Sequence, residues 1–484
     1  MNNIKNKTIS GLAWRYAERG GAEIIQFIVS IIIARILSPS DYGLIGLITV
    51  FISVANVFVT SGLGQALVQR KETDNTDYST VFFYSFAFSL VIYAILFSVA
   101  PFIAQFYNAP VLTSVVRVLG VTVIIGSLNG VQHAYVQKTM QFKRFFVSTL
   151  IGKLFSAIVG IYMALKGYGV WALVAQQITM TLADAVVLWF TVKWRPERKF
   201  SIKRMKEMFK YGWKLLCSNL IDTVYNNIYS LIIGKFYSTS DLGFYNRGKQ
   251  FPMLIINNIN TTIQSVIFPV LSEAQDEKTR LKSMVRRSIV TSTFILFPAM
   301  AGLAAIAKPL TVFLLTDKWL PAVPFIQFCC FTYAFWPVNT ANLQAINAVG
   351  RSDIFLKLEI IKKLMGIAVL CITLPHGLII MMIGRCITCV ISTFLNAFPN
   401  KKLLGYTYLE QVKDMAPSFV LSLIMIAIIL PVTLLPIPSV LQMIIQIVLG
   451  IGVYFALAKL FKLECFEYIL NTIKGFFKKR GNKE

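Results

Sequence analysis

The sequence predicts an all-α polytopic membrane protein with about 14 transmembrane helices. Of its 484 residues 56% are hydrophobic, only 14% are charged, and long apolar runs recur with short polar connections between them. A soluble protein of this size normally carries about a quarter charged residues. One apolar helix of roughly 20 residues crosses the hydrocarbon core, and a helix satisfies its own backbone groups in lipid.

The apolar runs define fourteen predicted spans, and most of the connections between them are only a few residues long. The spans lie near 11–37, 41–68, 77–103, 110–137, 143–165, 169–192, 209–236, 241–268, 284–308, 322–347, 353–374, 377–398, 416–435 and 438–460.

Basic residues gather in alternate connections, so that most of the 47 Lys and Arg lie on the side that holds the N-terminus. An excess of this kind marks the cytoplasmic side, which predicts that both termini are cytoplasmic. The polar stretch 1–10 leads directly into a long apolar run, so we expect no removable signal peptide. The basic amphipathic stretches 199–210 and 463–480 are typical of helices that lie among lipid headgroups.

A repeat divides the chain. Residues 30–43 read SIIIARILSPSDYG and residues 230–243 read SLIIGKFYSTSDLG, and Lys153 recurs as Lys363. An even number of spans separates the copies, which predicts a pseudo-two-fold axis along the membrane normal and a substrate site between the copies. The predicted parts are an N-lobe 1–198, a basic linker helix 199–208, a C-lobe 209–400, two further spans in 401–462 and an amphipathic tail 463–484.

Charged residues within the predicted spans are costly in lipid and normally face a lumen or a partner. Ten are basic and five are acidic, so a cavity that they line would attract an anion. The basic candidates for substrate binding are Arg15, Arg19, Lys153, Lys214, Arg247, Lys362, Lys363 and Arg385. The acidic candidates, for a coupling ion or for internal ion pairs, are Glu18, Glu23 and Asp222.

Some of these residues have a simpler interpretation. Arg15 and Lys214 lie near helix ends, where a long side chain can reach the headgroups. Asp41 and Asp241 follow Ser at a helix start, which is typical of N-terminal caps. The isolated His133 and His376, and the pair Cys386 and Cys389, are expected to have structural roles.

The runs 34–43 (ARILSPSDYG) and 62–69 (GLGQALVQ) resemble the first helical hairpin of Wzx-type polysaccharide flippases, a branch of the MATE/MOP superfamily. Among them, the exporters of colanic acid and teichuronic acid repeat units are especially similar. The resemblance implies two six-helix lobes, alternating access and an undecaprenyl-pyrophosphate-linked oligosaccharide as substrate, in the bacterial inner membrane. It also implies a functional monomer, working with polysaccharide polymerase machinery, that serves the synthesis of cell-surface polysaccharides such as O-antigen and lipopolysaccharide.

A substrate of this kind needs two sets of contacts. Arg and Lys suit the pyrophosphate, and amide, hydroxyl and aromatic groups suit the sugars. The candidates for sugar contacts are Asn56, Tyr225, Asn226, Tyr229 and Asn258. No cofactor is expected, apart from a proton or sodium ion as a coupling ion.

Three other functions stay open. A proton- or sodium-coupled drug/cation antiporter would need acids in the cavity, and Glu18, Glu23 and Asp222 could supply them. A membrane enzyme, such as a glycan polymerase, would need a long external loop with catalytic groups, and the sequence shows no paired carboxylates, phosphate-binding glycine loop or metal cluster. A scaffold without transport activity would leave the charges within the spans unexplained.

Overall fold

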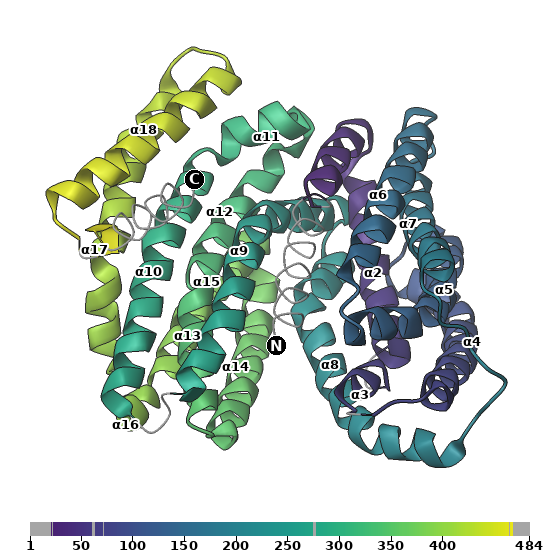
Figure 1. The fold of residues 1–484 in the computed structure, drawn as a ribbon. Coiled ribbons are helices and arrows are strands. Elements are labelled where there is room, and N and C mark those ends of the chain that lie inside the picture. Colours follow the sequence, from purple (N-terminus) through teal and green to yellow (C-terminus); the bar gives the residue numbers. More distant parts are fainter. Residues whose placement is uncertain are drawn as a thin grey trace, which may run out of the picture. The chain divides into compact units, whose positions relative to one another are not determined.

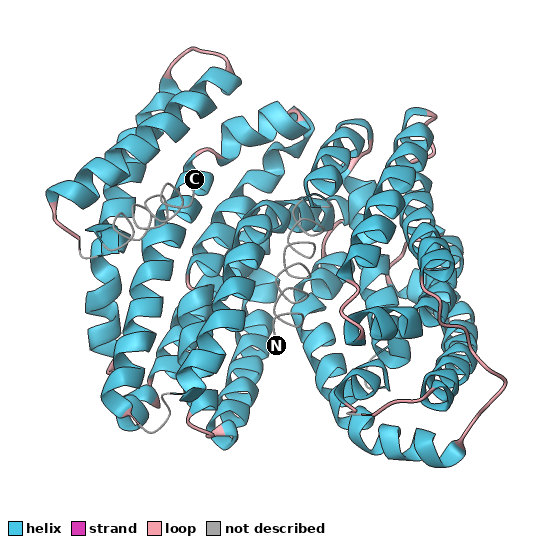
Figure 2. Cartoon of the chain, in the orientation of Figure 1, coloured by secondary structure: helices cyan, strands magenta, loops and turns pink. Residues whose placement is uncertain are grey.

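The computed structural model describes residues 21, 23–60, 63–70, 72–273, 277–463 and 465–467. These residues are helices joined by short turns, without a strand in the described ranges (Figure 2). The chain divides into two compact units, 1–246 and 247–484. The predicted boundaries of the lobes, the linker helix and the tail stay predictions.

The first unit contains a helical stretch over residues 21 and 23–36 and seven complete helices, and α9 begins in it (Figure 1). The helices are α2 (Pro39–Thr60), α3 (Leu63–Gln69), α4 (Asn75–Phe106), α5 (Val111–Lys138), α6 (Phe142–Leu165), α7 (Val170–Thr191), α8 (Ile202–Phe236) and α9 (Thr239–Glu273).

The second unit continues α9 and adds nine helices, of which α11 and α16 are short. They are α10 (Lys278–Ala305), α11 (Ala307–Leu315), α12 (Val323–Ala334), α13 (Trp336–Ala348), α14 (Ser352–Thr373), α15 (Leu378–Ala397), α16 (Asn400–Leu404), α17 (Tyr408–Ile429) and α18 (Ser439–Leu460).

The all-helical prediction is confirmed, and each predicted span from 41–68 onward falls on one or two helices. Ten helical segments of the described chain are long and apolar enough to cross a membrane, so this is a multi-pass membrane protein. Helices α8, α9 and α14 are long but do not reach that apolarity, because charged and polar residues interrupt them. The count of fourteen is therefore not confirmed.

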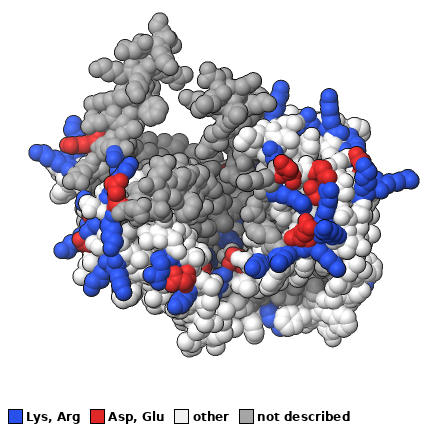
Figure 3. Space-filling model, turned by 60° about the horizontal axis from the view of Figure 1, so that its bottom comes forward, with Lys and Arg blue, Asp and Glu red and all other residues white. Residues whose placement is uncertain are grey.

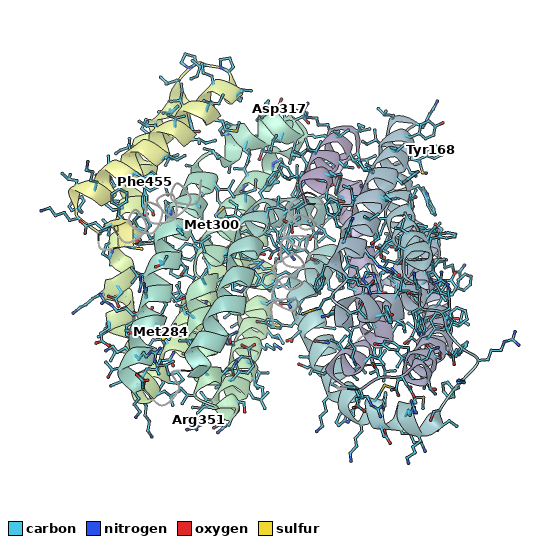
Figure 4. The ribbon with its side chains drawn as sticks, viewed as in Figure 1. Tyr168, Met284, Met300, Asp317, Arg351 and Phe455 are labelled. Carbon is cyan, nitrogen blue, oxygen red and sulfur yellow. The ribbon has the colours of Figure 1, made fainter. Side chains whose placement is uncertain are left out.

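The positions of helix ends in the second unit agree with spans that run alternately in opposite directions. In the second unit Met284 and Arg351 lie at one end of the helices and Asp317 lies at the opposite end (Figure 4). With the bottom turned forward, Lys and Arg side chains, with Asp and Glu among them, gather on the described surface (Figure 3). The cytoplasmic side stays a prediction.

The two copies of the repeated motif meet within the first unit. In each copy the Ser and Asp side chains cap a helix start: Ser38 Oγ donates to Asp41 Oδ2 at 2.6 Å, and Ser238 Oγ donates to Asp241 Oδ2 at 2.7 Å. The backbone N–H of each Asp donates back to its Ser Oγ. The predicted capping roles of Asp41 and Asp241 are therefore confirmed.

Gly43 and Gly243 lie where α2 crosses the start of α9. A Cβ atom on Gly43 would lie 1.7 Å from the carbonyl oxygen of Thr239, and one on Gly243 would lie 2.0 Å from that of Pro39. The hydroxyls of Ser40 and Thr239 are 2.7 Å apart beside this crossing. A local two-fold axis produces reciprocal contacts of this kind. Both copies of the motif need a glycine here because the backbones of α2 and α9 approach each other closely.

The other end of the first unit holds a network of ions. Asp77 on α4 is 2% exposed, and its Oδ1 accepts from Arg70 Nη1 at 3.3 Å and Arg204 Nη1 at 3.2 Å. Arg204 also pairs with Asp74, and this hydrogen bond is the main cause that lowers the pKa of Asp74 to about 2. Lys138 Nζ donates to the carbonyl of Arg70 at 2.6 Å. The network ties the ends of α3, α5 and α8 to the start of α4.

Buried amides tie the helices of the second unit together. Asn342 on α13 and Gln411 on α17 exchange two hydrogen bonds of 2.9 and 3.0 Å, and Asn400 Nδ2 donates to Asn342 Oδ1 at 2.7 Å. All three side chains are fully buried. Polar bonds of this kind between helices replace the hydrophobic driving force, which lipid does not provide.

We expect Gly43→Ala to destabilise the protein strongly. The added methyl group meets backbone, which cannot rotate away, and overpacking of this kind costs about 1–3 kcal/mol or more. Gly452→Ala on α18 is the matched control, because a Cβ there meets nothing within 4 Å and Ala favours a helix by about 0.5–1 kcal/mol over Gly. Thermal unfolding of both variants in detergent measures the difference, and equal melting temperatures would contradict the close crossing.

We expect Arg204→Met to destabilise the first unit by about 1–3 kcal/mol, because it leaves the buried Asp77 with fewer donors. The substitution should also change how the stability of the fold decreases at low pH. Because the pKa of Asp74 is lowered in the fold, its ionised carboxylate stabilises the fold at pH values above its ordinary pKa. This contribution is lost as the pH falls through about 2. Without Arg204, the pKa of Asp74 returns toward its usual value of about 4, so this contribution is absent and the stability of the variant should fall less between about pH 4 and pH 2 than that of the wild type.

The measurement is thermal unfolding between pH 2 and 6. Arg198→Met, which alters an exposed arginine of the same connection, is the control and should behave like the wild type. An Arg204→Met variant whose stability decreases at low pH as that of the wild type does would show that the pair with Asp74 contributes nothing.

Candidate functional site

A pocket of about 530 Å³ lies inside the first unit, among α2, α3, α4, α5 and α7. Its wall mixes aliphatic and glycine positions with groups that form hydrogen bonds. The polar members of its lining are Thr60, Ser85, Ser127, Asn129, His133, Gln137, Thr181 and Asp184. The volume falls in the range of about 300–1,000 Å³ that is typical of small-molecule sites.

Asp184 on α7 is the centre of this pocket's polar groups. Its Oδ2 lies 2.5 Å from Asn129 Nδ2 and 2.9 Å from His133 Nε2, both on α5, and Ser148 on α6 also bonds to the carboxylate. His133 stacks on Phe145 of α6, with 5.0 Å between ring centroids. Donors on two neighbouring helices thus hold a carboxylate that stays 20% exposed to the pocket.

The hydrogen bond to Asp184 decides the tautomer of His133. Nε2 carries the proton that it donates to the carboxylate, so Nδ1 is left as an acceptor when the ring is neutral. Asn129 Nδ2 also lies 3.0 Å from His133 Nε2, but two donor nitrogens do not bond to each other. We therefore assign both donors to Asp184.

The sequence interpretation of His133 as an isolated structural residue is incomplete. Asn129 and His133 are four residues apart on α5, which places them on one helix face, and Asp184 lies within the predicted span 169–192. This spacing is the one feature of the sequence that indicates a shared role for the two residues. Their contact with Asp184, which lies 51 residues from His133 along the chain, can be seen only in the folded structure.

Cationic side chains come together in the second unit. Lys249 on α9 lies close enough to Arg385 on α15 for the two charges to interact, and both lie close to Cys329 on α12. The Arg385 guanidinium is 5.8 Å from the ring centroid of Tyr333. Arg385 is one of the predicted binding residues, whereas Lys249, which lies within the predicted span 241–268, is not.

Arg247 has a different setting. Only 3% of the residue is exposed, its guanidinium lies 5.6 Å from the ring centroid of Trp319, and it donates to Gln250 one turn away. A guanidinium held this way packs α9 against the segment Asp317–Ala322. The structure therefore places Arg247 in the interior of the second unit, and a role for it in substrate binding stays a prediction.

The predicted residues of α14 form an ion pair. Lys362 Nζ lies 2.5 Å from Glu359 Oε1, and 14% and 28% of these side chains are exposed. Lys363 beside them is half-buried. The pair offsets the charge of Lys362, while Lys357 and Lys363 add further positive charge on this helix.

The other predicted residues of the first unit lie on several helices. Lys214 and Asn226 on α8 are exposed. The half-buried residues are Glu23, Asn56, Lys153, Asp222, Tyr225 and Tyr229. Tyr229 stacks on Tyr245 with 6.4 Å between centroids, so its ring takes part in packing.

Four predicted residues cannot be placed. Arg15, Glu18 and Arg19 lie outside the described residues, and the side chain of Asn258 does as well. The predicted roles of these four residues are therefore untested.

A second pocket, of about 370 Å³, lies among α9, α10, α17 and α18. Aliphatic and aromatic side chains such as Ile295, Met425 and Phe455 dominate its lining, and Gln446 is its one amide. A wall of this kind suits an apolar chain and cannot hold a phosphate. In the described residues, no group of three or more His, Cys, Asp or Glu could hold a metal ion.

Comparison with known proteins gives a consistent result. The family model described as "Polysaccharide biosynthesis protein" matches residues 32–324, more than half of the chain. The teichuronic acid biosynthesis protein TuaB of Bacillus subtilis (strain 168) is 24% identical over 73% of this chain and 74% of its own length. The lipopolysaccharide biosynthesis protein WzxC of Escherichia coli (strain K12) is 23% identical over 87% of this chain and 86% of its own.

Solved structures share the fold. The lipid II flippase MurJ in an inward closed conformation superposes with a TM-score of 0.77 at 15% identity, over 93% of this chain and 98% of that one. An inward-facing multidrug resistance MATE transporter superposes with a TM-score of 0.62 at 16% identity, over 79% and 95%. The resemblance seen in the sequence is thus confirmed.

We expect Asp184→Ala to destabilise the first unit by about 1–3 kcal/mol, because three donors, from Asn129, His133 and Ser148, lose their acceptor in a low-dielectric region. Asp184→Asn keeps the shape and one carbonyl acceptor, so its loss should be smaller. Melting temperatures in detergent measure both. If the two variants melted together with the wild type, the bonds to Asp184 would contribute nothing to the fold.

Proposed function

The chain belongs to the polysaccharide biosynthesis protein family, and from this membership we propose that it is a flippase for a lipid-linked oligosaccharide. The substrate is an undecaprenyl-pyrophosphate-linked repeat unit that the protein moves across the bacterial inner membrane by alternating access. The product feeds the synthesis of a cell-surface polysaccharide.

Family membership carries this proposal, and the cations Lys249 and Arg385 within the helices of the second unit support it. A charge in a low-dielectric region loses hydration, so its placement there is costly. A bound anion lowers that cost. A pyrophosphate, with several negative oxygens, fits a planar guanidinium and a mobile ammonium.

The fold supports the same function. A pyrophosphate headgroup cannot cross hydrocarbon without a polar path, and the solved structures that share this helical fold include a lipid II flippase and a multidrug resistance MATE transporter. The apolar polyprenyl tail can stay in lipid while the headgroup moves.

The antiporter for cationic drugs is the weaker alternative. Its site would need a net negative charge, whereas the candidate residues Lys249, Arg385 and Lys363 of the second unit are positive. The curated relatives TuaB and WzxC are named for teichuronic acid and lipopolysaccharide biosynthesis. Both facts favour an anionic, glycan-bearing substrate.

Further parts of the proposal come from the sequence. The protein performs no catalytic chemistry and needs no cofactor, and a proton or sodium ion supplies the coupling. It works as a monomer beside polysaccharide polymerase machinery, with both termini in the cytoplasm, as the basic connections predict.

We expect the double substitution Lys249→Gln with Arg385→Gln to reduce glycan export by at least about tenfold. Each charged hydrogen bond to a phosphate is worth about 1.5–3 kcal/mol, and about 1.4 kcal/mol is a factor of ten. The assay complements a strain that lacks the gene and measures surface polysaccharide together with the lipid-linked precursor that accumulates inside.

Lys357→Gln is the matched control, because this lysine is exposed on α14. The pair predicted from the repeat, Lys153 and Lys363, is tested as a double Ala variant in the same strain. Wild-type export by the Lys249 and Arg385 variant, at equal protein level in the membrane, would remove the cationic pair from the mechanism.

A further inference from the structure

The pocket of the first unit offers several acceptors of hydrogen bonds, beside the amide of Gln137 and the hydroxyl of Ser85, which can also donate. Thr181 Oγ1 donates its own proton to the carbonyl of Gln177 at 3.0 Å, and Thr60 Oγ1 donates to that of Asn56 at 2.7 Å. Each hydroxyl has one proton, so the oxygen of each is left with lone pairs only. Both residues line the pocket.

Asp184 and the residues bonded to it also offer acceptor positions to the pocket. An ionised carboxylate accepts about four hydrogen bonds, and Asn129, His133 and Ser148 supply three to Asp184. One acceptor position is therefore left on a side chain that is 20% exposed. When the ring of His133 is neutral, it adds the acceptor Nδ1, and its side chain is 46% exposed.

The negative charge of Asp184 disfavours binding of a phosphate in the pocket of the first unit. Among the described lining residues, Asp184 carries the only full charge besides any on His133, and Lys and Arg do not contribute to the wall. A phosphate is an anion that offers acceptors only, so it would meet a carboxylate and further acceptors. A ligand that has many hydrogen-bond donors and no negative charge would form hydrogen bonds with these acceptors.

The wall also has the shape of a ring-binding site. Gly64, Gly126 and Gly130 leave parts of it without side chains, and Val59, Val81 and Val131 supply apolar surface for C–H groups. The stacking of His133 on Phe145 fixes the imidazole plane beside the cavity.

We propose that this pocket, at Thr60, Asn129, His133, Thr181 and Asp184, binds a hydroxyl-rich, uncharged or amino-bearing sugar ring of the lipid-linked substrate. The inference rests on the proposed function and extends it, since it separates the sugar contacts in the first unit from the phosphate contacts in the second. Asp184 selects hydroxyl donors, and the two threonines accept from neighbouring hydroxyls.

The test is a protection assay in native membranes. Thr181→Cys places a thiol in the pocket, and the exposed native Cys371 on α14 serves as the internal reference. N-Ethylmaleimide labelling of both sites is followed by mass spectrometry in membranes that contain the host's lipid-linked glycan and in membranes from cells that cannot start its synthesis. Inorganic pyrophosphate is the third condition.

We expect glycan to slow labelling at position 181 relative to Cys371. Ligand at about ten times its dissociation constant slows it about tenfold, because the free site is then rare. Inorganic pyrophosphate should give no protection, and Asp184→Asn in the Thr181→Cys background should remove the protection by glycan. Thr60→Cys on α2 is a second reporter, used if the first variant does not fold.

Thr181→Val and Thr191→Val form a matched pair for export. Both threonines lie on α7 and donate to the carbonyl four residues earlier, but only Thr181 lines the pocket. We expect Thr181→Val alone to reduce export. Equal labelling with and without glycan, or protection by pyrophosphate, would overturn the sugar site.

Failure of this inference is distinct from failure of the proposed function. If glycan does not protect position 181 while the Lys249 and Arg385 variant loses export, only the sugar site is wrong. If the wild type itself exports no glycan, the proposed function is wrong whatever the labelling shows.

Discussion

Hydrocarbon provides no hydrogen-bonding partner, so each polar group that this chain buries must find one within the protein. Helices satisfy the backbone, and the side chains follow the same constraint. The exchange of bonds between Asn342 and Gln411 and the ions around Asp77 all tie separate helices together. What looks in the sequence like an interruption of an apolar run is in the structure a contact between helices.

The same constraint explains which parts of the fold could be predicted. Apolar runs must be helical in lipid, so the predicted spans from 41–68 onward fall on helices. The repeat predicted equivalent starts for α2 and α9, and the capping pairs at Asp41 and Asp241 agree. Composition could not decide how many of the helices cross, because α8, α9 and α14 carry charged residues whose surroundings depend on packing.

The candidate sites were harder to predict, for a related reason. A charged residue within a span indicates that a partner exists but does not indicate which one. Arg247 and Arg385 are alike in the sequence, yet one is enclosed against Trp319 and the other lies near Lys249. The partners of His133 and Arg204 lie 51 and 127–130 residues away along the chain, so only the fold could bring them together.

Sugar and pyrophosphate make opposite demands on a protein, and this opposition gives the two units different chemistry. Hydroxyls offer donors and tolerate a nearby carboxylate, whereas a pyrophosphate offers only acceptors and needs cations. A carboxylate such as Asp184 beside the phosphates would repel them, and a lysine against Asp184 would neutralise the carboxylate. In the sites that we propose, the acceptors of Thr60, Thr181 and Asp184 serve the sugar and the cations Lys249 and Arg385 serve the pyrophosphate.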